Sequence, residues 1–179
     1  MQDVYQKITA LLNEVPAKLP DAYDQDWTRC IKSELAELGA ERDHIVYANG
    51  IEAQQVRGEW VYDVTWAQET PDDSGSNTTK RIVLACECEW ARNWGDVWDD
   101  FDKLLQARAD YRVFITHQFG GQSVDDITDR LIKRVDAYEQ TSPGDTYLLA
   151  VYDNATQTFS PTLLEVLMPD NLRATRLMI

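Results

Sequence analysis

Two glutamates, separated by one residue in an otherwise apolar run, are the first side chains here that could do chemistry. Residues 81–90 read RIVLACECEW, and alternation along a strand places Glu87 and Glu89 on one face of a sheet. Carboxylates about 6.5–7 Å apart along a strand repel each other unless a cation lies between them. Mg²⁺ prefers oxygen ligands of this kind together with water. The pair predicts a divalent-metal site, although Glu89 at an exposed strand end is the alternative.

Two further acids occupy positions where apolar residues are expected. Asp63 lies in EWVYDVTWAQ, residues 59–68, whose β-branched and aromatic residues favour a strand. Glu34 falls within the apolar stripe of a helix predicted over 26–38, when residues are spaced at 100°. Because a buried, unpaired carboxylate is strongly unfavourable, each acid should bind a cation, be protonated or pair with a base. For Glu34, one such base is Arg108.

The hydrophobic pattern predicts an α/β domain with elements in the order α-α-β-β-β-α-β-α-β. Helical crossovers make the strands that they join parallel, so we expect a mixed central sheet flanked by helices on both faces. Apolar residues at helical spacing and β-branched runs place these elements. The helices are expected at about 2–15, 26–38, 94–109 and from Ser123 onward, and the strands at 44–48, 59–68, 81–90, 112–117 and 147–152. We expect residues 69–80 to form an exposed loop, and the tail from Ser160 to add a short strand or cover a sheet edge.

Composition narrows the classes of protein that this chain can belong to. A net charge of −14 without any Lys/Arg cluster argues against a protein that grips duplex DNA unaided, because such proteins present a basic face. No apolar run reaches the length of a membrane span. The first fifteen residues predict an amphipathic helix rather than a signal peptide, so a cytoplasmic protein without membrane contact is expected. A doubly wound nucleotide-binding fold is disfavoured because its glycine fingerprints are missing from the sequence.

The three cysteines, Cys30, Cys86 and Cys88, are too few and odd in number for a disulfide framework. A zinc site that used Cys86 and Cys88 would need two more ligands, and the chain has only His44 and His117. Packed core thiols are therefore the favoured interpretation.

Together, these acids and the element order resemble the PD-(D/E)XK nuclease superfamily, whose fold is called restriction-endonuclease-like. The resemblance rests on Asp63, on the Glu87-Cys88-Glu89 run and on the helical Glu34. It implies an α-β-β-β-α-β core in which an Asp of the second strand and an (Asp/Glu)-x-Lys of the third hold Mg²⁺. A glutamate of the preceding helix often completes that site.

The resemblance divides the chain as a single domain, 1–179. Residues 26–152 form the nuclease-like core, 1–20 an N-terminal helix and 153–179 a C-terminal extension.

The resemblance also implies roles for individual residues. Asp63, Glu87 and Glu34 would hold Mg²⁺ or Mn²⁺, which polarises the scissile phosphate and activates water for in-line attack. Glu89 stands in place of the usual lysine, as in some restriction endonucleases, and would orient that water or take its proton. In other members the lysine has moved to the following helix, where Lys103 is the candidate. At 100° per residue, however, Lys103 lies opposite the apolar stripe, which predicts a solvent-exposed side chain.

The function implied is that of a Mg²⁺-dependent nuclease, an endonuclease or exonuclease that hydrolyses phosphodiester bonds. The alternative is a non-catalytic member of the same fold that acts as an acidic protein-binding or regulatory subunit; a DNA mimic ranks last because the acids are spread along the whole chain. The charge predicts weak nucleic-acid binding by the chain alone, strengthened by a basic partner chain or domain; a protein partner or a homodimer is expected. The candidate phosphate contacts flank the two acidic strands: Arg57, Lys80, Arg81 and Arg92.

Overall fold

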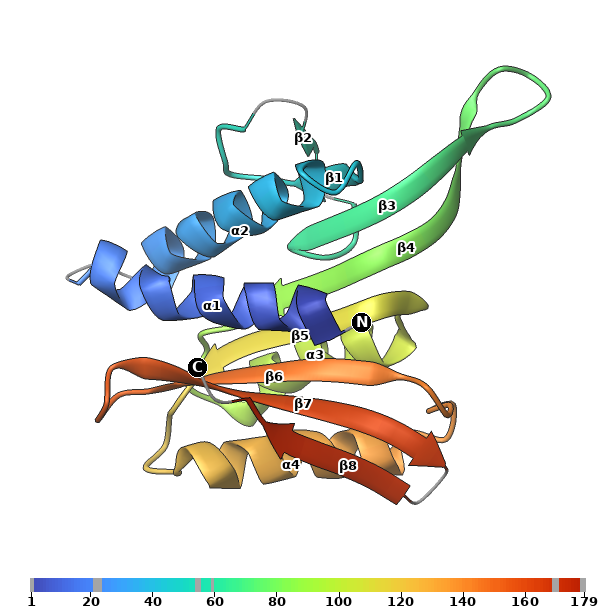
Figure 1. The fold of residues 1–179 in the computed structure, drawn as a ribbon. Coiled ribbons are helices and arrows are strands. Elements are labelled where there is room, and N and C mark those ends of the chain that lie inside the picture. Colours follow the sequence, from blue (N-terminus) through green and yellow to red (C-terminus); the bar gives the residue numbers. More distant parts are fainter. Residues whose placement is uncertain (1, 21–23, 54–55, 59, 169–170, 178–179) are drawn as a thin grey trace.

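A computed structural model describes residues 2–20, 24–53, 56–58, 60–168 and 171–177. Within them, eight strands form one mixed sheet in the order β2-β1-β3-β4-β5-β6-β7-β8, accompanied by four helices (Figure 1). The helices are α1 (Gln2–Lys18), α2 (Asp24–Ala40), α3 (Trp94–Gln106) and α4 (Val124–Ala137). The strands are β1 (Ile45–Ala48), β2 (Val56–Arg57), β3 (Val64–Pro71), β4 (Asn77–Cys88), β5 (Ala109–His117), β6 (Thr146–Asp153), β7 (Thr158–Met168) and β8 (Asn171–Arg176).

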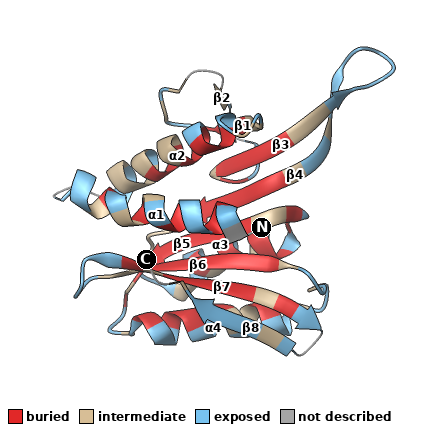
Figure 2. Cartoon of the chain, viewed as in Figure 1, coloured by how far each residue is buried: buried red, intermediate tan, exposed pale blue. Residues whose placement is uncertain are grey.

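The helices cover the two faces of the sheet in pairs. Helices α1 and α2 share one buried apolar cluster with inward-facing residues of the strands, and α3 and α4 share a second cluster on the opposite face (Figure 2). On the first face Trp66 is fully buried, and its indole N–H donates to the Leu35 carbonyl at 3.0 Å. A Cβ at Gly39 would lie 2.6 Å from Trp66 Nε1, so α2 approaches the sheet as closely as it does because residue 39 has no side chain.

The directions of the strands determine which strand ends, and therefore which side chains, lie together. Strands β1, β3 and β4 are antiparallel neighbours, whereas β4, β5 and β6 run parallel, with α3 and α4 as their crossovers. The carboxyl ends of β4, β5 and β6 therefore lie at one edge of the sheet. The start of β3 meets the end of β4 at that same edge.

The α/β class and the mixed sheet with helices on both faces agree with the expectation, but the element order is longer than predicted. It reads α-α-β-β-β-β-α-β-α-β-β-β, because β2 is added and the tail forms two strands, β7 and β8. Residues 69–80 are mostly exposed, as predicted, but only the centre of this segment is a loop. Strands β3 and β4 continue as a projecting hairpin, with Glu69 opposite Thr79 and Thr70 opposite Thr78 (Figure 1). Main-chain pairing and β-branched threonines sustain a strand there without any apolar face.

No helix among the described residues combines the length and apolar character needed to cross a membrane.

Candidate functional site

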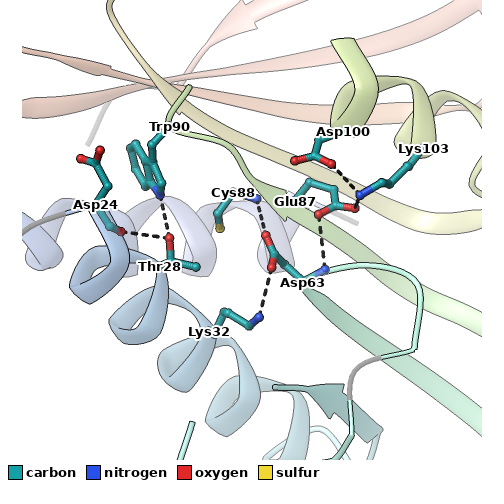
Figure 3. A network of polar contacts seen from close by, with 9 residues as sticks. All are labelled: Asp24, Thr28, Lys32, Asp63, Glu87, Cys88, Trp90, Asp100 and Lys103. Carbon is teal, nitrogen blue, oxygen red and sulfur yellow. Dashed lines mark hydrogen bonds and ion pairs between the residues drawn. The ribbon is translucent and has the colours of Figure 1, made fainter. Parts of the chain in front are cut away.

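Asp63 and Glu87 come together where β3 begins and β4 ends. Val64 is paired with Cys86, so Asp63 falls opposite Glu87 across the antiparallel ladder. The Asp63 backbone N–H donates to Glu87 Oε2 at 3.4 Å, and the Cys88 backbone N–H donates to Asp63 Oδ2 at 2.9 Å (Figure 3). The structure thus unites these two residues of the predicted metal site.

A lysine stands against each of the two carboxylates (Figure 3). Lys103 of α3 places its ammonium 3.3 Å from Glu87 Oε1 and 2.5 Å from Asp100 Oδ1. Lys32 of α2 lies 3.0 Å from Asp63 Oδ1 and is only 6% exposed. The cluster therefore contains two lysines and three acids, in contact in the order Lys32, Asp63, Glu87, Lys103 and Asp100.

Glu87 is the most perturbed acid of this cluster. It is 3% exposed, and its Oε1 accepts no hydrogen bond from the residues that the structure describes, although Lys103 is within ion-pair distance. Burial, followed by the charge of Asp63, raises the pKa of Glu87 from 4.5 to about 8, against the opposing effect of Lys103. Near neutral pH this carboxyl is mostly protonated, and an added cation would favour its charged form.

Glu89 lies one residue beyond the end of β4, where its backbone N–H still donates to the Ile115 carbonyl at 2.9 Å. Its carboxylate accepts from the Ala91 backbone N–H at 2.5 Å. Burial and a hydrogen bond with Asp100 raise the pKa of Glu89 above its ordinary value. Asp100 thus contacts both Glu89 and Lys103, which links these two predicted catalytic residues.

Glu34 lies apart from this cluster, contrary to its predicted place as a third metal ligand. Its Oε1 is 2.6 Å from Lys18 Nζ, and the side chain is partly exposed. The buried side of α2 is formed by Ile31, Lys32 and Leu35 instead. Because Glu34 is two positions from Lys32, it points about 200° around the helix from the residue that contacts Asp63. In the described part of the chain, no three His, Cys, Asp or Glu side chains are close enough to share one metal ion.

Lys103 reaches further than its helical angle suggested. Its side chain is 44% exposed, as expected for a residue opposite the apolar stripe, yet its ammonium contacts buried Glu87. The angle fixes the direction of the Cα–Cβ bond, whereas a flexible four-carbon stem can carry the charge back towards the sheet. The predicted solvent exposure of Lys103 is therefore confirmed, and the contact of its ammonium with Glu87 is an addition that the helical angle did not indicate.

Lys32 is the functional candidate that sequence reasoning missed. A usable signal was present, since Lys32, Ala36 and Gly39 follow the i, i+4, i+7 spacing of a buried helix face. A lysine in such a row needs an acidic partner, and Asp63 is that partner.

The two carboxylates fit a hard divalent ion. Mg²⁺ in phosphate-processing sites is commonly held by one or two carboxylates together with substrate oxygens and water. Asp63 and Glu87 provide that number, and Glu87 Oε1 is a buried acceptor without a hydrogen bond among the described residues. A zinc site is less well matched: Cys86 and Cys88 are free, buried thiols that pack in the α1/α2 cluster.

Comparisons of the chain with protein-family models, with curated proteins and with solved structures find no match. The chemistry of the clustered side chains is therefore the basis on which a function is assigned.

Proposed function

We propose that the protein is a metal-dependent nuclease whose catalytic residues are Asp63, Glu87, Glu89 and Lys103. The observation that carries this proposal is a buried glutamate of β4, next to the aspartate that immediately precedes β3, with a lysine of the following helix at 3.3 Å. The order α2-β1-β3-β4-α3-β5 supports it, because it resembles the α-β-β-β-α-β unit of the PD-(D/E)XK superfamily once the two-residue β2 is set aside. Lys103 then corresponds to the lysine that some members carry on this helix.

Each residue has a distinct task in this proposal. A bound Mg²⁺ or Mn²⁺ would polarise the scissile phosphate and lower the pKa of a water molecule. Asp63 and Glu87 supply carboxylate oxygens, and Glu87 must release its proton to do so. The Lys103 ammonium faces the same carboxylate and can hold negative charge on a phosphate oxygen. Glu89, whose pKa is also raised, is positioned by Ala91 and Asp100 to orient the water or accept its proton.

The charge distribution supports weak binding of nucleic acid by the chain alone. Arg57 is ion-paired with Glu69 at 2.5 Å, and Arg81 is ion-paired with Asp110. Two of the four candidate phosphate contacts are thus already neutralised, which reduces the counterion release that drives binding. We propose that a basic protein partner completes the nucleic-acid surface, in the cytoplasm.

A non-catalytic role is the second candidate, and one observation favours it. Lys32 and Lys103 each pair with one of the acids, so the cluster is partly neutralised without a metal. Trp60 and Val61, just before Asp63, are exposed apolar side chains of the kind found at protein interfaces. In this case the fold would serve as an acidic protein-binding subunit.

A cleavage assay separates the two candidates. Single- and double-stranded DNA and RNA are incubated at low salt with the wild type, with Asp63→Asn and with Asp129→Asn, a matched change at an exposed acid. The nuclease proposal expects cleavage that requires Mg²⁺ or Mn²⁺, is at least about 100-fold slower in Asp63→Asn and is unchanged in Asp129→Asn. Absence of cleavage with every substrate, even with basic partner peptides added, would favour the non-catalytic subunit.

A further inference from the structure

A hollow of about 270 Å³ opens beside Asp63 on the α2 side of the sheet. It lies between the N-terminal half of α2 and the segment after β1, and is lined by Gln25, Thr28, Arg29, Lys32, Asn49 and Gly50. Among the lining residues that the structure describes, two are cationic, three carry neutral polar groups and none is acidic. In a chain with 31 acids and 17 lysines and arginines, a hollow of this composition is suited to an anion.

Lys32 connects the hollow to the candidate catalytic site. Lys32 is more than nine-tenths buried and lines the hollow. Its ammonium lies 3.0 Å from Asp63 Oδ1. Only the Lys32 ammonium would therefore separate an anion in the hollow from Asp63, the carboxylate that we assign to metal binding.

Thr28 shapes the wall of the hollow, and Arg29 supplies a charge that can reach an anion. The Thr28 hydroxyl donates to the Asp24 carbonyl at 3.0 Å and accepts from the Trp90 indole at 2.7 Å, so its position is fixed from two sides (Figure 3). Arg29 is 62% exposed, and its guanidinium is ion-paired with Asp26 at 3.3 Å. An exposed pair of this kind is weak, so the guanidinium can exchange Asp26 for a stronger anion.

We propose that this hollow binds a phosphate of the nucleic-acid strand, next to the phosphate that is cleaved. The inference rests on the proposed nuclease function, because a substrate held at Asp63 and Glu87 would carry its neighbouring phosphate past Lys32. Arg29 contacts the phosphate oxygens from the solvent side, and Lys32 lies between that phosphate and Asp63. The site positions the strand and reads no base, since phosphate contacts carry no sequence information.

Binding without metal tests the hollow separately from catalysis. Anisotropy of a labelled single-stranded oligonucleotide is measured at low salt in chelator, for the wild type, Arg29→Gln and Arg108→Gln, a matched change at an exposed arginine outside the hollow. We expect Arg29→Gln to weaken binding about three- to tenfold and to reduce the salt-dependence slope by about 0.7. Arg108→Gln should change the affinity less than about twofold. Equal weakening in both variants would overturn the proposal.

A charge introduced into the hollow gives a second test. Asn49→Asp keeps the size of this exposed side chain, adds an acid and should abolish oligonucleotide binding, whereas Asn77→Asp at the hairpin tip should not. Millimolar inorganic phosphate should displace the oligonucleotide from the wild type but not from Arg29→Gln. Arg29-dependent binding of inorganic phosphate with no added affinity for an oligonucleotide would overturn the assignment to a strand. Arg29-dependent oligonucleotide binding without cleavage in any metal would support the hollow and reject the nuclease.

Discussion

Replacement of Glu87 by glutamine should stabilise the metal-free protein, and by an amount that depends on pH. The folded-state pKa of Glu87 is about 8, against an ordinary value of 4.5. A raised folded pKa means that the stability present below the unfolded value is lost as the pH rises through the folded value. The stability of the wild type should therefore fall between pH 4.5 and pH 8. Lys103 stays charged throughout this range, so its own titration does not change the free energy of unfolding with pH.

The size of the effect follows from these two pKa values. At about 1.36 kcal/mol for each pKa unit, the free energy of unfolding should fall by roughly 4–5 kcal/mol across the window, with roughly 3 kcal/mol lost by pH 7. Glutamine has no charge to desolvate but gives Lys103 a weaker partner. We therefore expect Glu87→Gln to be about 2 kcal/mol more stable than the wild type at pH 8.

Urea unfolding at pH 5 and pH 8, in metal-free buffer, measures this difference. Glu139→Gln, at an exposed position, is the matched control and should leave stability within about 0.5 kcal/mol of the wild type at both pH values. A Glu87→Gln variant that is destabilised at pH 8, or that shows the same difference at both pH values, would refute the reasoning.

Three further outcomes are expected. Millimolar Mg²⁺ or Mn²⁺ should raise the melting temperature of the wild type near pH 8 but not that of Asp63→Asn, because a ligand stabilises only the state that binds it; scanning calorimetry compares them. Gly39→Ala should lower the free energy of unfolding by about 1–3 kcal/mol in urea titrations, since the added Cβ would lie 2.6 Å from Trp66 Nε1; a neutral effect would show that α2 can shift. Lys103→Met should slow metal-dependent cleavage by about 100-fold while Lys103→Arg retains part of it, and equal rates in the two variants would count against a role for the positive charge.

The two central acids could be predicted because they contradict their surroundings. Asp63 and Glu87 lie in segments whose other residues favour a buried strand, so each demanded a partner. Their meeting depended on the register of β3 against β4, which the element order made plausible. Glu34 was also expected to need a partner, but its partner is Lys18 of α1 rather than a metal ion. The periodicity of α2 could not predict this pair, because it carries no information on how α1 packs against α2.

Other features depend on contacts that local patterns do not carry. The hairpin beyond Gln68 and the last two strands are stabilised by main-chain pairing with neighbours, so they need no apolar alternation. The contact of Lys103 with Glu87 depends on where α3 crosses the sheet and on the reach of a long side chain. The strand pairing and the Lys103–Glu87 contact both depend on the tertiary arrangement, whereas hydrophobic periodicity describes one element at a time.

Titration calorimetry with Mn²⁺ tests most directly whether Asp63 and Glu87 bind a divalent ion. We expect one ion to bind to the wild type near pH 7 with the release of close to one proton, because Glu87 is mostly protonated in the free protein. The proton is detected by repeating the titration in buffers with different ionisation enthalpies. Glu87→Gln and Asp63→Asn should lose the binding, and Asp129→Asn should retain it. No binding by the wild type at millimolar Mn²⁺, or equal binding by all four proteins, would contradict the assignment of a metal site to Asp63 and Glu87.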